Sequence, residues 1–400
     1  MDAPLVPTTA NRSIWYGALV VGVGCVLALG AHAQVVDEDQ LRKVDLPKSQ
    51  GLISSIASLP DGRSLLIGYT KGAPIVQVDT NSWSVTASYP LSGYPDGPRI
   101  SISQDGHYLH AFALPRFADG RQSDPVIAHT LIDLSTGRTL QTFQAKDASL
   151  SADGRTLART VPDGAELIST ASGAVIRTLP IAGLANAIAL APDAITIAVA
   201  HAPTLEQLGL VPSLRNDKKA IKGALKFRQM VSFYNTSTGV LVATVPEVYD
   251  IIRSMTYTSD GAHLLIHSTN DPRAPGSTAI ASPFGINAVG MAGRIELVDA
   301  MQHAPLRTSF WTRMSNPVLA VDPTGTILAL SGTEGRNKRK VTIHGLHDGE
   351  TQLMIDLEQK HRYDVAEDET HDGRTVHAWM PDGRLVIALG QSLGFYTPVP

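Results

Sequence analysis

The amino-acid sequence predicts an all-β fold: a seven-bladed β-propeller of four-stranded antiparallel blades, with the ring closed by an N-terminal strand in the last blade. Three observations predict it. A strand, an Asp-Gly turn and a second strand recur along the chain, the intervals between these turns consist of short strands and tight turns, and the last interval is one strand short. A repeat of about 40–65 residues built in this way is typical of blades arranged around an axis.

The turn motif is clear at five positions and weaker at two. The clear copies are Asp61-Gly62, Asp105-Gly106, Asp153-Gly154, Asp260-Gly261 and Asp382-Gly383, and the weaker copies are Asp193-Ala194 and Thr324-Gly325. An Asp side chain bonds local amides and Gly accepts positive φ, so both residues suit tight turns. Seven copies predict seven blades.

The segments between the turns have the composition of strands, since they are rich in Ile, Val, Ser, Thr and Tyr and are bounded by Gly, Pro, Asn or Asp. The blades are expected at about 51–94, 99–145, 147–183, 187–248, 254–313, 318–357 and 374–398. The last blade has three strands, and a missing outer strand would leave an open edge. Residues 41–47 supply a candidate strand, so both termini would meet in blade seven.

A second repeated pattern marks the turn between the third and fourth strands. It reads Val78-Asp79-Thr80 in blade one and Ile132-Asp133-Leu134-Ser135-Thr136-Gly137 in blade two. Together with Pro-Asp-Gly-Arg at 60–63 and 381–384, this pattern resembles the bacterial YVTN-type and WD-repeat-like seven-bladed propellers over residues 34–400. The resemblance implies a propeller fold. No Gly-His pair opens a blade, as in WD repeats, and the Trp-Asp pair is absent from the sequence, so the hydrogen-bond network that these pairs build is not expected.

The first 33 residues have the pattern of a secretory leader. Arg12 precedes an apolar run over residues 14–30, and Ala31-His32-Ala33 follows, with small residues at the two specificity positions. We expect cleavage after Ala33 and export to the periplasm or the exterior of a bacterium; an uncleaved anchor remains the alternative. The single cysteine, Cys25, lies in this segment. The mature chain would then have no transmembrane segment, disulfide, thiolate metal site or cysteine nucleophile.

The charge balance gives no support to a general role in binding nucleic acid or membranes. The 400-residue chain has 33 Lys and Arg against 37 Asp and Glu, a formal net charge of −4. An electrostatic function must therefore be local. We expect a monomeric propeller whose partner is a protein or an anionic polymer, not a nucleic acid.

The long insertions all fall in one set of loops. They are expected at 115–125, 203–229, 270–292, 334–339 and 358–373, and each joins strands two and three of a blade or links two blades. These loops share one face of a propeller, opposite the face of the tight turns. Insertions confined to one face of a repeat fold indicate a binding face.

Two of these insertions are rich in basic residues. The candidate basic patch consists of Arg215, Lys218, Lys219, Lys222, Lys226, Arg228, Arg336, Lys338, Arg339 and Lys340. In the blade-four insertion, Ser213 could cap a short helix with Leu214, Ile221 and Leu225 on one side. The patch could accept an acidic protein surface, a polysaccharide or a lipid phosphate. A solvated basic helix without a ligand is the alternative.

Candidates for metal binding are weak, and no cofactor is expected. The link before blade seven collects His361, Asp364 and His371 among other acidic residues, but their spacing matches no defined metal loop, so a solvated acidic link is favoured. His263 and His267 share one strand face at a spacing of four, for which a structural role is favoured. The blade-five insertion, rich in Gly, Ala, Ser and Pro, could be a lid or a plain loop.

The sequence favours binding over catalysis. It contains no Gly-x-Ser-x-Gly elbow, no Trp after Gly137 as quinoprotein repeats would have, and no sialidase Asp-box. We therefore expect an exported, non-enzymatic binding or scaffold propeller that recognises a protein or polymer through the insertion face. The alternative is a hydrolase or lactonase-like enzyme, because residues from separate blades could assemble a polar or metal site at the channel mouth.

Overall fold

The computed structural model describes residues 33–46, 51–113, 117–118, 121–122, 126–181, 183–269, 293–334, 338–357 and 376–398. The chain divides into two units, 1–32 and 33–400, and all described residues belong to the second. The predicted leader and its Cys25, Arg336 and the acidic link with His361, Asp364 and His371 lie outside the described residues, as do most of residues 115–125 and all of residues 270–292.

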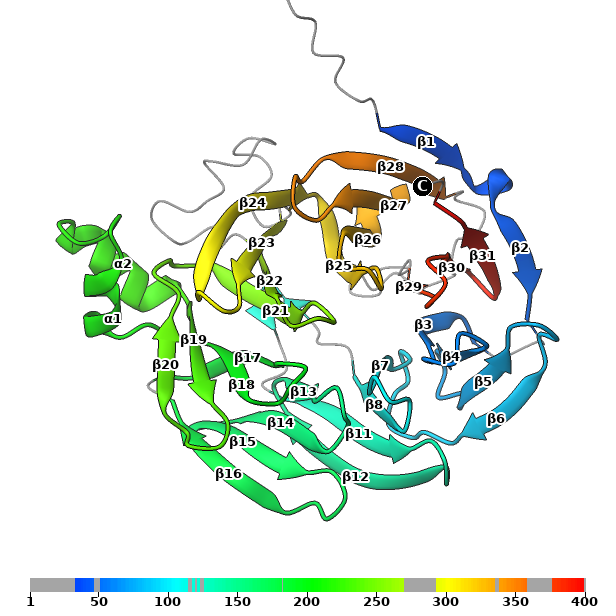
Figure 1. Cartoon of the computed structure of the whole chain (residues 1–400), viewed down its shortest axis with the longest axis horizontal. Helices are drawn as coiled ribbons and strands as arrows, with labels where there is room; N and C mark the ends of the chain where they lie inside the picture. Colours follow the sequence, from blue (N-terminus) through cyan, green and yellow to red (C-terminus); the bar gives the residue numbers. More distant parts are fainter. Residues whose placement is uncertain are drawn as a thin grey trace, which may run out of the picture. The chain divides into compact units, whose positions relative to one another are not determined.

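The second unit is a ring of seven four-stranded antiparallel blades around a central axis, as Figure 1 shows, so the predicted fold class is confirmed. Blade one consists of β3 (Ile53–Ser58), β4 (Ser64–Tyr69), β5 (Ile75–Asp79) and β6 (Val85–Tyr89). Blade two consists of β7 (Arg99–Ile102), β8 (Tyr108–Phe112), β11 (Ile127–Asp133) and β12 (Arg138–Ala145). The small hairpin β9 (Phe117–Ala118) and β10 (Arg121–Gln122) lies between β8 and β11.

Blades three to five continue this order. Blade three consists of β13 (Ala148–Leu150), β14 (Thr156–Val161), β15 (Gly164–Ser169) and β16 (Val175–Pro180). Blade four consists of β17 (Ala185–Leu190), β18 (Thr196–His201), β19 (Met230–Asn235) and β20 (Leu241–Thr244), with helices α1 (Leu205–Leu210) and α2 (Lys218–Phe227) between β18 and β19. Blade five consists of β21 (Ile251–Tyr257), β22 (His263–Thr269), β23 (Gly293–Asp299) and β24 (Ala304–Thr312).

The last two blades use the N-terminal segment of the described chain. Blade six consists of β25 (Met314–Val321), β26 (Ile327–Glu334), β27 (Lys338–Gly345) and β28 (Thr351–Leu357). Blade seven consists of β29 (His377–Trp379), β30 (Leu385–Leu389), β31 (Ser392–Tyr396) and the N-terminal strand β2 (Arg42–Asp45). The segment before β2 forms β1 (Gln34–Asp37) and a 3-10 turn (Glu38–Gln40).

The ring is closed as predicted, because β2 pairs antiparallel with β31 from Arg42 opposite Phe395 to Asp45 opposite Ser392. The sequence did not predict β1, which pairs parallel with β28 and gives blade six a fifth strand. The N-terminal segment therefore spans the outer edges of two neighbouring blades, as Figure 1 shows.

The repeated turn has one hydrogen-bond pattern in the five clear copies. The Asp side chain accepts the backbone N–H two residues ahead, as Asp61 does from Arg63 at 2.8 Å and Asp153 does from Arg155 at 3.0 Å. Gly62 and Gly154 each have φ of 65°, a conformation that favours glycine. The weaker copy at 193–194 keeps the same bond, from Ile195 N–H to Asp193, but places Ala194 at φ 57°.

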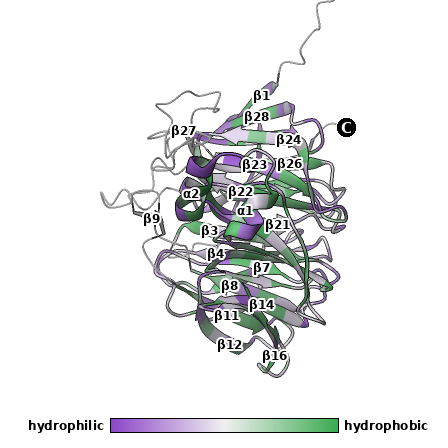
Figure 2. Ribbon diagram, turned by 90° about the vertical axis from the view of Figure 1, so that its left-hand side faces the viewer, coloured by the Kyte–Doolittle hydropathy of each residue, from purple (hydrophilic) through white to green (hydrophobic). Residues whose placement is uncertain are grey.

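The hydrophobic core lies between neighbouring blades. Ile67 of blade one packs in one cluster with Val386 of blade seven, and Phe233 of blade four packs with Ile266 of blade five. Each blade is therefore stabilised by its neighbours, as in other repeat folds. Figure 2 shows hydrophilic residues on α2, on the side of the molecule that faces the viewer.

Candidate functional site

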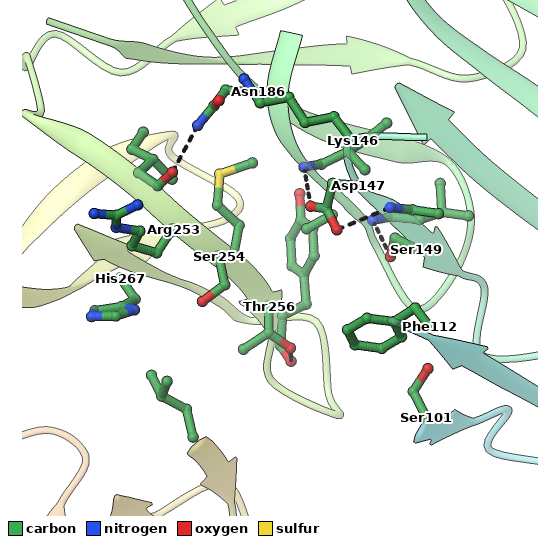
Figure 3. A pocket seen from close by; sticks show the side chains of 18 of the residues that line it. Ser101, Phe112, Lys146, Asp147, Ser149, Asn186, Arg253, Ser254, Thr256 and His267 are labelled. Carbon is green, nitrogen blue, oxygen red and sulfur yellow. Dashed lines mark hydrogen bonds between the residues drawn. The ribbon is translucent and has the colours of Figure 1, made fainter. Parts of the chain in front are cut away.

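A cavity of about 950 Å³ occupies the central channel, and Figure 3 shows it from close by. Its wall comes mainly from the innermost strands of five successive blades, namely β7, β13, β17, β21 and β25, with further residues from the end of α2. A volume of this size lies near the upper end of the range of about 300–1,000 Å³ typical of small-ligand sites. The channel is therefore large enough to hold a small ligand.

The end of the channel at the tight turns is bridged. The side-chain amide of Gln104, in the first turn of blade two, donates to the carbonyl of Ser259 in the corresponding turn of blade five at 3.1 Å. The Gln104 backbone N–H also donates to the carbonyl of Ala152 in blade three at 2.7 Å. Three blades thus meet around Gln104, which narrows this end.

Charged residues gather at the opposite end, where the insertions lie. The charged residues of the cavity wall are Arg99, Lys146, Lys226, Arg228, Arg253, Asp147 and Asp250. Arg99, Asp147 and Arg253 occupy the beginnings of innermost strands or the residue just before them. Because those strands run toward the tight turns, their beginnings mark the insertion face.

Asp147 connects two blades while facing the cavity. Its carboxylate accepts the N–H of Ile188 in β17 and the N–H of Ala148, both at 2.9 Å. Burial raises the pKa of Asp147 to about 7, although these two amides and the charge of Lys146 lower it. Burial also lowers the pKa of Lys146, and the charge of Asp147 offsets part of that effect.

Further hydrogen bonds hold blades three, four and five in register around the cavity. The Ser149 hydroxyl accepts the N–H of Leu190 at 3.0 Å. The Asn186 side chain donates to the carbonyl of Ile252 at 2.8 Å. The wall of the cavity is therefore fixed by side chains that bond to the backbone of the next blade, as Figure 3 shows.

Blade five contributes a buried histidine beside an arginine. The Arg253 Nε donates to the Thr269 hydroxyl at 2.8 Å. His267 is 3% exposed, and burial together with the charge of Arg253 lowers its pKa to about 3. His267 is therefore neutral at physiological pH. His263 is the first residue of β22. Its ring contacts the ring of His347 edge to face, with 5.3 Å between the ring centroids.

The helical part of the predicted basic patch is exposed. Arg215 and the four lysines of α2, namely Lys218, Lys219, Lys222 and Lys226, are exposed. The opposite side of α2 packs through Ile221 and Ala224 into a small core with Leu208 of α1 and Met230. Asp217, and not Ser213 as predicted, caps the helix by accepting the N–H groups of Lys219 and Ala220, both at 2.9 Å.

Arg228 does not belong to this exposed set. Its guanidinium forms an ion pair with Asp250, and both side chains are almost completely buried in the channel wall. Arg228 was predicted to belong to the patch because it follows the lysines directly in the sequence. A run of charged residues does not indicate which of its side chains is buried in the fold. Its role here is to neutralise Asp250.

The described residues of the blade-six part of the patch lie on a strand. Glu334 of β26 pairs directly with Lys338 of β27, and residues 335–337 of the predicted insertion lie outside the described residues. Lys338, Arg339 and Lys340 all belong to β27. Blade five lies between this strand and α2 in the order of the ring, as Figure 1 shows.

No cluster of three or more His, Cys, Asp or Glu residues that could hold a metal ion occurs among the described residues. Neither α1 nor α2, the α-helices of the described chain, is long and apolar enough to cross a bilayer.

The charged residues of the channel come from separate blades, so no continuous motif in the sequence marks them. A signal was nevertheless present. Arg99, Asp147, Asn186 and Arg253 each precede the Asp of their own blade's first turn by six or seven residues. Aligning the blades on that turn would have shown polar residues entering the channel at corresponding positions.

Comparisons with known proteins support the fold only. No family model and no curated protein sequence matches the chain. Among solved structures, the chain is similar to the β-propeller domain of Cps50 (Swd1) from Myceliophteria thermophila, with a TM-score of 0.58 and 14% sequence identity over 90% of this chain and 100% of that one. This agreement supports the β-propeller fold. The WD-repeat-like and bacterial YVTN types remain predictions.

Proposed function

We propose that this chain is an exported, non-enzymatic binding propeller that docks an acidic protein surface on α1 and α2 of the insertion face. One observation carries the proposal: α2 is anchored by its apolar side, while Lys218, Lys219, Lys222 and Lys226 on the other side are exposed. Because the helix is fixed to blade four, its positive charges have a defined position. Such a surface favours a partner with complementary negative charge.

A protein is favoured over a polysaccharide or a lipid phosphate because apolar side chains accompany the lysines. Leu205 and Leu210 of α1 are 64% and 61% exposed, and Leu225 of α2 is also exposed. Exposed leucines beside charged residues match the mixed apolar and polar composition of protein interfaces. A partner recognised only through phosphates or sugar carboxylates would gain nothing from these leucines.

The proposed cellular location rests on the N-terminal sequence. The segment from Arg12 to Ala33 has the order of a secretory leader, and export followed by cleavage would release a propeller that begins near β1. The proposal includes no cofactor and no nucleic acid, and it treats the propeller as a monomer.

The test is a capture experiment with a charge-reversed surface. A triple variant with Lys218, Lys219 and Lys222 changed to Glu should lose a partner that the unchanged protein retains from an envelope extract at low salt. A matched triple variant, with Lys71, Arg138 and Arg155 changed to Glu on other exposed positions, makes the same change in net charge. Loss with both triples, or with neither, would refute docking on α2. Added salt should weaken the capture.

A second candidate function, a hydrolase or lactonase-like enzyme, is favoured by one observation, the Asp147 carboxyl in the cavity. A carboxyl with a pKa of about 7 can exchange protons near neutral pH and could act as a general acid or base. Under this candidate, the protein would hydrolyse members of a lactone and ester panel, and Asp147→Asn would abolish that hydrolysis. Absence of hydrolysis across the panel by the unchanged protein favours the binding function.

A further inference from the structure

We infer that the channel cavity is a binding site for a small ligand that carries an oxyanion, either a carboxylate or a phosphate, held near Lys146 of blade three and Arg253 of blade five. The site shares Leu225 and Lys226 with the proposed partner surface on α2, and its other lining residues belong to the wall of the channel. It goes beyond the proposed function because it assigns a small-molecule ligand to the interior of the ring.

The charge of the wall is the first step. Five cationic side chains line the cavity against two carboxylates. One carboxylate, Asp250, is already paired with Arg228. The other, Asp147, already accepts two backbone N–H groups. Among the residues that line the cavity, cationic side chains therefore outnumber carboxylates, and this composition favours an anionic ligand over a cationic one.

Lys146 shows why this imbalance matters for binding. The cavity partly buries its ammonium group, and burial lowers its pKa. In the described part of the chain, no hydrogen bond from this ammonium group is seen; the nearby charge that acts on it is that of Asp147. An oxyanion beside Lys146 would supply a charge-assisted hydrogen bond in a partly desolvated place, where such bonds are strong.

The wall also offers polar groups to the rest of a ligand. Successive residues of a strand point to opposite sides, and on β21 Ser254 and Thr256 are exposed to the channel while Met255 between them is buried. Ser101 of β7 is exposed in the same cavity. Figure 3 shows these hydroxyls around the open space.

His267 is an independent sign that a polar group is missing. Its side chain lines the cavity and is 3% exposed, and its Nε2 has no hydrogen-bond partner among the described residues. Buried polar atoms in native proteins nearly always have a partner. A ligand in the cavity could provide one.

The shape of the channel favours a small ligand over a threaded chain. The Gln104 side chain bonds to Ser259 across the end of the channel at the tight turns, so that end is narrowed. A ligand would enter from the insertion face and meet Lys146 and Arg253 first. The hydroxyls of blade five lie further along the same path.

The experiment is calorimetric titration of the purified mature protein with three probes: succinate, inorganic phosphate and succinamide, the uncharged counterpart of succinate. We expect at least one of the two anions to bind and succinamide to bind at least tenfold more weakly. Lys146→Met removes the charge, and Ser254→Leu fills the channel without changing any charge. Each should weaken binding of the anion at least tenfold, while Lys222→Met, on the exposed side of α2, should change it less than twofold.

The inference would be overturned by the absence of any heat of binding with either anion at concentrations up to about 10 mM, tenfold above a Kd of about 1 mM, by equal binding of succinamide, or by equal weakening by Lys222→Met. A hexaglutamate peptide separates this site from the α2 surface. If the anions bind and Ser254→Leu weakens them but leaves the peptide unaffected, two distinct sites exist. If Ser254→Leu leaves the anions unaffected as well, the anions bind outside the channel and the inference is wrong. Thermal unfolding of each variant confirms that it is folded.

Discussion

The Lys43 ammonium lies 3.0 Å from the Glu38 carboxylate, and this ion pair joins the two halves of the N-terminal segment. Glu38 follows β1 on blade six, and Lys43 belongs to β2 on blade seven. The Glu38 side chain is fully buried, whereas that of Lys43 is 42% exposed. The bond to Glu38 raises the pKa of Lys43. The segment therefore connects two blades as well as completing one of them.

This relationship predicts that Glu38→Gln destabilises the propeller. The substitution removes the main charged partner of Lys43 and places a neutral amide in the buried position. This should lower the free energy of unfolding by about 1–3 kcal/mol. Urea unfolding at neutral pH measures the change. Asp39→Asn is the matched control, because the Asp39 carboxylate is 3.5 Å from the same ammonium but 78% exposed. It should change the free energy by less than about 0.5 kcal/mol. Similar values for the two variants would contradict the argument.

The closure of the ring could be predicted because its signals are local. An Asp-Gly turn needs only residues such as Asp61 and Gly62, and an absent fourth strand in blade seven can be counted along the chain. β1 could not be predicted in the same way. Four residues give no clear strand pattern, and their pairing with β28 depends on an edge formed by residues more than 300 positions away. The closure by β2 could thus be predicted from the strand count of one blade, whereas the pairing of β1 depends on residues distant in the sequence.

The candidate site was predicted only where its residues are consecutive. The lysines of α2 form a run in sequence, and they are exposed as expected of a solvated helix face. Lys146 and Arg253 are more than 100 residues apart, and only the ring brings blades three and five to one cavity. Arg228 shows the opposite difficulty, since it follows the run directly and yet turns inward to Asp250. Residues that are close in the sequence of this protein are thus not always close in the structure, and residues of one site are not always close in the sequence.

The buried histidines of blade two predict that acid destabilises the protein. The His110 Nε2 and the His129 Nδ1 lie 3.0 Å apart, and the two rings are stacked. Burial lowers the pKa of His129 to about 4 and that of His110 well below its ordinary value, to which the charge of His129 also contributes. The unfolded chain therefore binds protons that the folded chain does not. Stability should be fully present above about pH 6.5 and should fall as the pH decreases toward 4.

Urea unfolding at a series of pH values between about 8 and 4 measures this loss. A double variant, His110→Leu with His129→Phe, should reduce the slope of free energy against pH by up to about two protons. His107→Gln is the control, because His107 is exposed in the turn before β8. An unchanged slope in the double variant would show that other buried groups cause the acid sensitivity.

Asp147 predicts the opposite dependence on pH. Its pKa in the folded protein, about 7, lies above its ordinary value. Stability from this group is therefore present below about pH 4 and is lost as the pH rises through 7. Asp147→Asn removes the charge and keeps one of the two side-chain oxygens, so one of the N–H groups of Ile188 and Ala148 loses its acceptor at every pH. The change in unfolding free energy caused by the substitution should therefore be about 1–3 kcal/mol more favourable at pH 8.5 than at pH 4.5.

The measurement for Asp147→Asn is the difference in urea midpoint between the variant and the unchanged protein at these two pH values. Asp163→Asn, at an exposed turn of blade three, is the control and should show no difference that depends on pH. The lost acceptor affects both pH values alike, so a shift in urea midpoint that is the same at pH 4.5 and pH 8.5 would contradict the raised pKa of Asp147.

The repeated turns predict a difference between two glycines of nearly the same conformation. Gly154 and Gly72 have φ of 65° and 66°. A Cβ on Gly154 would lie 2.2 Å from the Tyr108 ring of the neighbouring blade, whereas a Cβ on Gly72 would meet nothing within 4 Å. Both Ala substitutions carry the cost of a positive φ, about 1 kcal/mol. Gly154→Ala must in addition move Tyr108, which should raise its total cost to about 3 kcal/mol or more.

Thermal and urea unfolding of the two variants measure the difference. A double variant, Gly154→Ala with Tyr108→Ala, isolates the contact, because removing the ring should cancel most of the extra cost. If both single variants lose equal stability, the turn of blade three is not pressed against blade two, and the packing of each turn on its neighbour does not help to hold the ring.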